Sequence, residues 1–240
     1  MAFAFDGRIA VKLGTFQGPA MNFPQRLIDG YNAFASGRLR REQDRYRELA
    51  ETGQRPEILV IGCCDSRVSP EVIFDASPGE LFVVRNVANI VPPYLPDGQA
   101  HGVSAALEFG IGALHIKHIV VLGHAHCGGV RAFADHAEPL SPGDFIGKWM
   151  ALMAPAAGKT PRGTLSPADY LTRLEQANVI NSLDNLLTFP RLAKLIEKGK
   201  VATHGAYFGV ASGDLSVLDK NSGEFKRVVP EGAAFAAPRF

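Results

Sequence analysis

Three short runs of consecutive apolar residues mark the middle of the chain. They are residues 58–61 (ILVI), 81–84 (LFVV) and 119–122 (IVVL). Continuous apolar runs of this length, bounded by loops, are typical of strands buried on both faces of a parallel sheet. Between the second and third runs, apolar side chains recur at helical spacing over 102–116: Val103, Leu107, Ile111 and Leu114. Strand, helix and strand in this order predict a parallel α/β sheet with a helical crossover.

The segments on either side of this unit are predicted to be mainly helical. Residues 24–50 carry apolar side chains at helical spacing, followed by a charged stretch that suits a solvated helix. Further helices are expected in three places: 143–153, 167–186 and 189–198. The second of these begins with two favourable residues, because Ser166 can cap it and Pro167 suits its first position. Residues 1–20 show no clear period, so we expect an N-terminal extension of undetermined structure.

The end of the chain, residues 201–229, is predicted to form two or three short strands. Turn signals at 212–214 (SGD) and 221–223 (NSG) separate them. The expected fold class is therefore α/β, with a mostly parallel central sheet, flanking helices and an antiparallel C-terminal edge strand. No repeat or linker interrupts residues 21–240, which we expect to form a single domain.

Composition and charge narrow the possible functions. A chain of 240 residues with 46% hydrophobic side chains can bury a substantial core. The formal net charge is +1, so no overall field favours nucleic acid or an anionic membrane, and small-molecule chemistry is the better expectation. Asp6 and Arg8 interrupt the apolar run at 3–5, which predicts neither a secretory signal nor a membrane span. The three cysteines are too few for a disulfide framework and indicate thiols in a reducing, cytoplasmic compartment.

Two loops that follow predicted strands carry metal-binding side chains. Residues 63–67 (CCDSR) follow the first strand, and if extended geometry persists, Cys63 faces one side of the chain and Cys64 the other. Residues 123–129 (GHAHCGG) follow the third strand and offer His124 and Cys127, although periodicity alone does not separate His124 from the neighbouring histidine at 126.

Topology predicts that these two loops meet. In an open parallel sheet, ligands bind beyond the carboxyl ends of the strands. Two thiolates and one imidazole suit zinc, and three protein ligands with a fourth position left for water form a catalytic arrangement, whereas structural zinc sites are normally closed by four ligands. We find no convincing fourth soft ligand in the sequence.

The two motifs together resemble those of the beta-carbonic anhydrases. The similarity also includes residues 82–89 (FVVRNVAN), the crossover helix and 204–207 (HGAY), and covers roughly residues 21–229. The resemblance implies one Zn²⁺ per subunit, held by Cys63, His124 and Cys127. It also implies that Asp65 pairs with Arg67 and accepts a hydrogen bond at the metal. The implied reaction is the reversible hydration of carbon dioxide to bicarbonate and a proton by zinc-bound hydroxide.

The same resemblance extends to the substrate pocket. It assigns substrate-binding positions to Gln54, Phe82, Val87 and Gly128, partly contributed by a second subunit, and so implies a homodimer or higher homo-oligomer. Gln54 and Phe82 match members with an always-open site. The bicarbonate-allosteric members instead carry tryptophan where this chain has Val60. One departure from the open-site members is Phe109, where they usually carry tyrosine; the missing hydroxyl predicts slower proton transfer.

Other interpretations of these residues remain open at this stage. The same zinc centre occurs in relatives that hydrolyse carbon disulfide or carbonyl sulfide, and a non-catalytic, zinc-stabilised binding or sensing module is a further alternative. We interpret Cys64 as core packing, His126 as a loop residue and Arg85 as a structural hydrogen-bond hub. Five further residues are expected to have structural or solvent-exposed roles: His101, His115, His118, Asp135 and His136.

Overall fold

The computed structural model describes residues 23–136 and 145–229, so the predicted extension over 1–20 lies outside the described residues. The chain divides into two compact units, with the boundary between Glu48 and Leu49. None of the helices in the described ranges is both long and apolar enough to cross a membrane.

Two helices make up the described part of the first unit, as predicted for 24–50. They are α1 (Gln25–Ser36) and α2 (Arg38–Thr52), of which the last residues of α2 extend into the second unit. The Phe34 and Tyr46 rings meet edge-on with centroids 6.1 Å apart. Neither helix has a buried residue, so the apolar side chains on α1 remain available for contacts.

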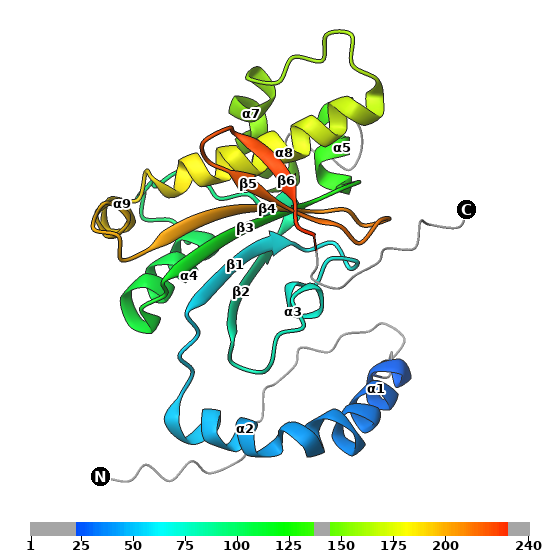
Figure 1. The fold of residues 1–240 in the computed structure, drawn as a ribbon, viewed down its shortest axis with the longest axis vertical. Coiled ribbons are helices and arrows are strands. Elements are labelled where there is room, and N and C mark those ends of the chain that lie inside the picture. Colours follow the sequence, from blue (N-terminus) through cyan, green and yellow to red (C-terminus); the bar gives the residue numbers. More distant parts are fainter. Residues whose placement is uncertain (1–22, 137–144, 230–240) are drawn as a thin grey trace, which may run out of the picture. The chain divides into compact units, whose positions relative to one another are not determined.

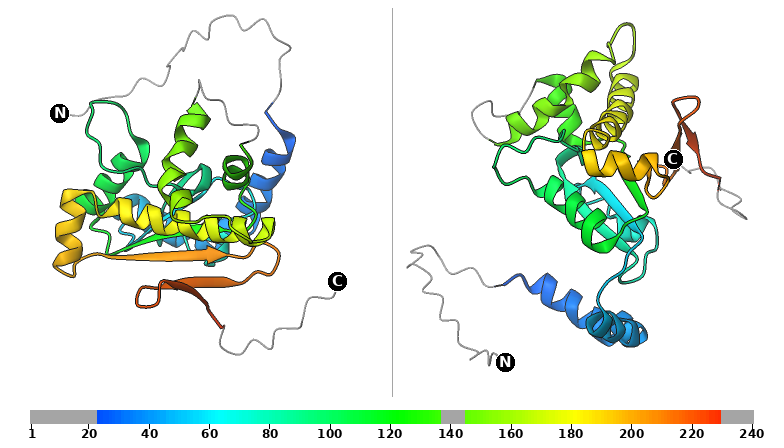
Figure 2. Two further views of the ribbon diagram at one scale, coloured as in Figure 1. Left: turned by 90° about the horizontal axis from the view of Figure 1, so that it is seen from above. Right: turned by 90° about the vertical axis from the view of Figure 1, so that its left-hand side faces the viewer.

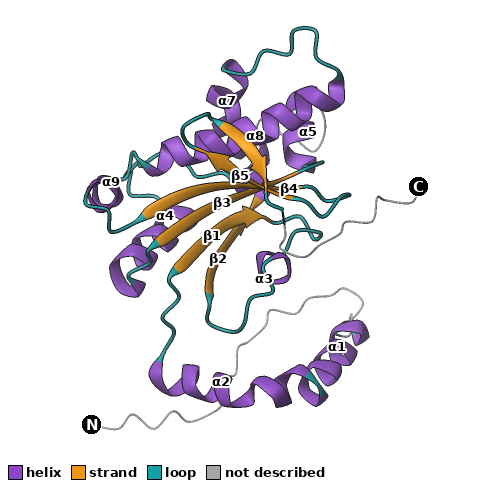
Figure 3. Cartoon of the chain, viewed as in Figure 1, coloured by secondary structure: helices purple, strands orange, loops and turns teal. Residues whose placement is uncertain are grey.

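The second unit is built on a six-stranded sheet with the order β2-β1-β3-β4-β5-β6 (Figures 1 and 3). The strands are β1 (Ile58–Cys63), β2 (Leu81–Asn86), β3 (His118–His124), β4 (Ala202–Phe208), β5 (Leu215–Asp219) and β6 (Glu224–Arg227). The first four are parallel, and β5 and β6 are antiparallel to their neighbours. The predicted α/β class is confirmed, and its antiparallel C-terminal edge is a two-stranded hairpin.

Helices cover one face of this sheet. The longer ones are α4 (Gly102–Phe109), α5 (Gly128–Asp135), α8 (Pro167–Leu186) and α9 (Pro190–Glu197). Figure 2 shows α8 running along the sheet. Side chains that point to this face from β1 and β3 pack in one core with residues of α4, α8 and α9: Leu59, Ile61, Ile119, Val121, Val103, Leu107, Val179, Leu183, Leu186 and Leu192.

The predicted helix over 167–186 is confirmed, including its start. Ser166 lies at the N-cap and its hydroxyl oxygen accepts the backbone N–H of Asp169 at 3.1 Å. Pro167 takes the first position, where its missing N–H costs nothing. The helix predicted over 189–198 is also found, as α9.

Two other predicted helices are interrupted. The crossover helix ends as an α-helix at Phe109 and continues as a π-helical segment, Gly110–Leu114, which is capped by His115 in a left-handed conformation. A Cβ at Gly110 would lie 3.1 Å from a Leu59 methyl carbon, so a close approach to the sheet accompanies this change.

The helix predicted over 143–153 begins outside the described residues. Its described part consists of α6 (Phe145–Met150), a 3₁₀ turn (Ala151–Met153) and α7 (Ala154–Gly158). Pro155 lies in the first turn of α7, where proline starts a new helix rather than continuing the previous one. Three elements were not predicted from the sequence: α3 (Pro70–Ile73), a 3₁₀ turn (Val87–Asn89) and α5, whose first two residues were expected to lie in a loop.

Candidate metal centre

Cys63, His124 and Cys127 meet at the carboxyl edge of the sheet. Cys63 is the last residue of β1, His124 is the last residue of β3, and Cys127 immediately precedes α5. Because β1 and β3 are parallel neighbours, both strand ends reach the same edge. The three ligand atoms lie within 4.8 Å of one another, and the residues are only 4%, 1% and 2% exposed.

The orientation of His124 leaves one ring nitrogen for a ligand. Nδ1 lies 2.9 Å from the carbonyl oxygen of Ala125, to which it can donate a hydrogen bond. Nε2 is buried and has no hydrogen-bond partner among the described residues. A buried polar atom without a partner costs free energy. The bond at Nδ1 fixes the tautomer that exposes an Nε2 lone pair, as metal-bound histidines require.

The two sulfur atoms are spaced for a shared ion. Cys63 Sγ and Cys127 Sγ lie 4.0 Å apart, whereas a disulfide requires about 2.05 Å. Two sulfurs at about 2.3 Å from one tetrahedral zinc ion lie about 3.8 Å apart. The spacing of the sulfurs and the nature of the three donors therefore both fit zinc.

The shifted pKa values of the three residues also fit a site that binds a cation in place of protons. The hydrogen bond from the Cys127 thiol lowers the pKa of Cys63 against the effect of burial. The Cys63 thiolate, followed by burial, raises the pKa of Cys127. Burial lowers the pKa of His124, but Cys63, the Ala125 carbonyl and Asp65 together outweigh it and the net shift is upward. Without a metal, these groups hold protons among themselves, and a divalent cation would replace them.

Asp65 and Arg67 form a forked pair beside the cluster. Asp65 Oδ1 accepts from the Arg67 backbone N–H at 3.0 Å and from Nε at 2.9 Å, and Oδ2 accepts from Nη2 at 2.7 Å. These bonds hold the pKa of Asp65 well below its ordinary value. Asp65 is not a member of the three-residue ligand group. It is therefore an ionised, oriented carboxylate next to the candidate metal position.

Arg85 fixes the chain directly after β1. Its Nε donates to the Cys63 carbonyl oxygen at 2.8 Å, and Nη2 donates to the Asp65 carbonyl oxygen at 2.7 Å. The prediction that Arg85 is a structural hydrogen-bond hub is confirmed. By holding two carbonyl groups, it sets the direction in which the Cys63 and Asp65 side chains leave the backbone.

The turn after β2 supports the Cys63 sulfur. Ala88 has φ 63°, a left-handed conformation that is uncommon for a non-glycine residue, and is fully buried. Its N–H donates to Cys63 Sγ at 3.4 Å, as does the N–H of Asp65. Asn178 of α8 donates to the Ala88 carbonyl oxygen at 2.7 Å. Strained backbone held by surrounding contacts is common at functional sites.

The structure brings two of the four predicted pocket residues to this edge. Gly128 follows Cys127 and starts α5, and Val87 packs over Gly129, where a Cβ would come within 2.8 Å of a Val87 methyl carbon. Gln54 precedes β1 and lies at the end of that strand opposite Cys63.

Phe82, the fourth predicted pocket residue, also lies away from the cluster. It stands near the start of β2, opposite Leu59. Its ring centroid is 6.0 Å from that of Phe109, the residue at which open-site relatives usually carry tyrosine. Within one chain, neither Phe82 nor Gln54 reaches the candidate metal position.

One interpretation of the other polar residues is wrong. Cys64 is exposed rather than packed in the core, because it leaves the extended chain on the side opposite the buried Cys63. Asp135 and His136 are exposed as predicted, and His126 lies in a turn, in agreement with its interpretation as a loop residue. His101 is hydrogen-bonded to Asp97. The remaining two, His115 and His118, are exposed as well.

Sequence reasoning missed Glu175 and the role of Tyr207. Glu175 lies on the buried side of α8 and is 4% exposed. It accepts the backbone N–H of Cys127 at 2.9 Å and the Tyr207 hydroxyl at 2.6 Å. Burial raises the pKa of Glu175, although both hydrogen bonds oppose the shift. The available signal was a charged residue on the apolar stripe that includes Val179 and Leu186.

Comparison with known proteins agrees with this geometry. The family model described as carbonic anhydrase matches residues 58–215. Beta carbonic anhydrase 3 of Arabidopsis thaliana is 38% identical in an alignment 203 residues long, and the match covers 81% of this chain and 77% of that protein.

Two solved structures show the same fold. The beta-carbonic anhydrase CcaA has a TM-score of 0.78 and 31% identity, covering 86% of this chain and 92% of its own. A structure from a study of two tetrameric beta-carbonic anhydrases of Sordaria macrospora has a TM-score of 0.71 and 27% identity, covering 81% and 95%. With these matches added to its buried Cys-His-Cys cluster, the chain belongs to the beta-carbonic anhydrases and is an enzyme, a carbonate dehydratase.

Proposed function

We propose that the chain catalyses the zinc-dependent, reversible hydration of carbon dioxide to bicarbonate and a proton, with one zinc ion held by Cys63, His124 and Cys127. The observation that carries the proposal is the convergence of two sulfurs and an imidazole nitrogen, all buried, within 4.8 Å. Zinc bound there supplies Lewis acidity, which activates water toward carbon dioxide at neutral pH.

In this proposal Asp65 orients the reacting water. The pKa of Asp65 is lowered by Arg67, so the carboxylate is ionised at neutral pH and accepts an O–H through a lone pair that Arg67 does not use. Arg67 engages both carboxylate oxygens and so opposes rotation of Asp65 onto the metal. The side chain of Arg67 is 48% exposed, which leaves Asp65 close to solvent, where the product proton must leave.

We further propose that the site belongs to the open type and is not closed by bicarbonate. Val60 is 1% exposed and packs with Leu122 and Ala206 in an apolar cluster, which offers no donor to an anion. The nearby Arg85 guanidinium already binds two carbonyl oxygens. Both observations support a centre in which Asp65 stays off the metal.

A homodimer or larger homo-oligomer is proposed as the active form, with Gln54 and Phe82 supplied to the site by a neighbouring subunit. Support comes from their location at the amino ends of β1 and β2, away from Cys63. Exposed apolar side chains on α1, including Leu27 and Tyr31, also support association. Sedimentation velocity and the hydration assay, both at the same micromolar concentration, test this proposal. A monomer that is fully active would contradict it.

A cytoplasmic location is proposed because the three cysteines form no disulfide with one another, as is usual in reducing compartments. Fractionation of cells that express the full chain, followed by blotting, provides the measurement. Recovery of the protein in an oxidising compartment would contradict the proposal.

Stopped-flow hydration of carbon dioxide, before and after zinc removal, tests the proposed reaction. Cys63→Ser is the test variant, and Cys64→Ser is its matched control, because Cys64 is exposed and lies outside the ligand group. We expect activity to require zinc, to be lost in Cys63→Ser and to persist in Cys64→Ser. Full activity in the zinc-free protein, or equal loss in both variants, would contradict the proposal. Parallel assays with carbonyl sulfide and carbon disulfide check the substrate.

A further inference from the structure

A single peptide unit in the loop before α5 is held from both ends by charged side chains. It is the peptide between His126 and Cys127. Arg67 Nη2 donates to the His126 carbonyl oxygen at 3.1 Å. The Cys127 N–H at the other end donates to Glu175 Oε1 at 2.9 Å. The positive end of the peptide dipole thus faces a carboxylate and the negative end faces a guanidinium.

Glu175 is itself held in place by a second bond. Its Oε2 accepts the Tyr207 hydroxyl of β4 at 2.6 Å, so both carboxylate oxygens meet donors, as an ionised carboxylate requires. Among the residues the structure describes, no lysine or arginine forms a salt bridge with Glu175. Burying a carboxylate that has only two neutral hydrogen-bond donors costs free energy. A residue retained at that cost is a candidate for a specific structural role.

The loop needs such support because its backbone is strained. His126 has φ 57°, in the left-handed region that non-glycine residues rarely adopt. Strain of this kind persists only where surrounding contacts over-determine the conformation. The Cys127 N–H precedes the first turn of α5, so the helix itself does not fix it. The orientation of this peptide sets the direction of the Cys127 Cα–Cβ bond and therefore the position of Sγ.

We propose that Glu175 is a positioning residue of the metal centre, which locks the His126–Cys127 peptide so that Cys127 Sγ faces the metal. Tyr207 orients Glu175, and Arg67 holds the opposite end of the same peptide. This inference rests on the proposed zinc site and adds a role for a residue that is not a ligand. It also couples the Asp65–Arg67 pair to the Cys127 ligand through one peptide unit.

Three variants separate the hydrogen bond from the charge. Glu175→Gln keeps an oxygen for the Cys127 N–H and an amide that can donate to the Tyr207 oxygen, so it removes the charge and reverses the Tyr207 bond but keeps both contacts. Glu175→Ala removes the support altogether, and Tyr207→Phe removes only the outer bond. Asn181→Ala is the matched control, because Asn181 is a buried α8 residue that donates to the Leu152 carbonyl oxygen and bonds neither Cys127 nor the turn after β2.

The measurements are zinc affinity, by competition with a chelator, and the visible spectrum of the cobalt(II)-substituted protein, which reports sulfur coordination. Loss of a group that orients a metal ligand typically lowers metal affinity 10- to 100-fold. We expect a loss in this range for Glu175→Ala, with weakened sulfur-to-cobalt bands. A smaller loss is expected for Tyr207→Phe, while Glu175→Gln and Asn181→Ala stay within about threefold of the parent protein.

Parent affinity and an unchanged cobalt spectrum in folded Glu175→Ala would overturn the inference, and so would a full loss in Glu175→Gln. If Glu175→Ala does not fold, Tyr207→Phe decides, and parent values there would also overturn it. Failure of the parent protein to bind one zinc through the three ligands would instead refute the proposed function. The two failures are therefore distinguishable.

Discussion

Cys63 Sγ and Cys127 Sγ lie 4.0 Å apart, although 64 residues separate them in the sequence. The parallel pairing of β1 with β3 produces this proximity, because it brings the ends of both strands to one edge of the sheet. The hydrogen bonds of Arg85 and Glu175 then fix the two loops that carry the sulfurs. The metal centre thus depends on topology first and on loop geometry second.

Variants of the Asp65–Arg67 pair should lose turnover but keep the bound metal. Asp65→Asn should lower kcat about 100-fold, since positioned proton acceptors typically contribute 100- to 10,000-fold. Arg67→Lys should lower it about 10-fold, because lysine keeps the charge but not the fork. Stopped-flow rates and zinc content by mass spectrometry check both, with the exposed neighbour Ser66→Ala as control. A parent kcat in Asp65→Asn would contradict the assigned role.

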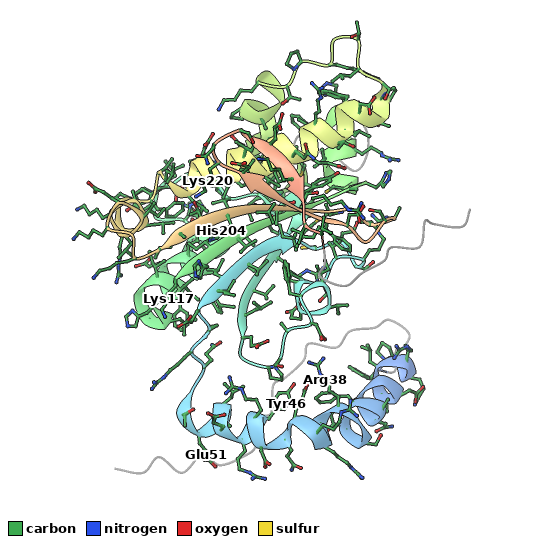
Figure 4. All side chains as sticks on the ribbon, in the orientation of Figure 1. Arg38, Tyr46, Glu51, Lys117, His204 and Lys220 are labelled. Atoms are coloured by element: carbon green, nitrogen blue, oxygen red, sulfur yellow. The ribbon has the colours of Figure 1, made fainter. Side chains whose placement is uncertain are left out.

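The environment of His204 should make the stability of the folded protein depend on pH. It lies on β4 with its Nε2 3.2 Å from His118 Nδ1, and Figure 4 labels Lys220 on the neighbouring hairpin. Burial, followed by the charges of His118 and Lys220, lowers the pKa of His204. Protonation is therefore harder in the folded state, so stability is present above pH about 6.5 and is lost as pH falls through the lowered pKa.

Urea unfolding of the zinc-free protein between pH 8 and 5 measures this dependence. In His204→Gln the decrease in unfolding free energy on acidification should be smaller than in the parent protein. The exposed residue His115, changed to Asn, provides the control and should keep the parent slope. An identical pH dependence in the parent protein and His204→Gln would show that His204 does not contribute.

Gly123, the residue before His124, lies in close contact with α8. A Cβ at Gly123 would lie 2.5 Å from Val179 Cγ2 of α8, so Gly123→Ala should destabilise the protein by about 1–3 kcal/mol. Val179→Ala removes the obstructing methyl groups. The double variant should therefore be less destabilised than the sum of the two single variants, as measured by urea unfolding. Strict additivity would indicate that this contact is not made.

The sequence predicted the elements whose signals are local. The strands at 58, 81 and 119 follow from apolar runs, and α8 follows from its Ser166 cap, its Pro167 start and its length. The meeting of the ligand-bearing loops follows from parallel topology. These features need only periodicity, turn residues and the rule that parallel strands end at one edge.

Features that depend on tertiary contacts were not predictable in this way. Glu175 is buried because Cys127 and Tyr207, distant in sequence, supply its hydrogen bonds. Cys64 is exposed because nothing in the described chain covers the side opposite Cys63. The π-helical end of the crossover depends on how closely Gly110 approaches Leu59. Each outcome is decided by a neighbour that the local pattern does not contain.

Zinc K-edge X-ray absorption of the purified protein tests the central claim most directly. We predict one zinc per chain with two sulfur scatterers at about 2.3 Å and nitrogen or oxygen scatterers at about 2.0 Å. Cys63→Ser and Cys127→Ser should each lose one sulfur scatterer or lose the metal, whereas Cys64→Ser should match the parent spectrum. A parent spectrum with fewer than two sulfurs, or a sulfur count unchanged in Cys63→Ser, would contradict the account.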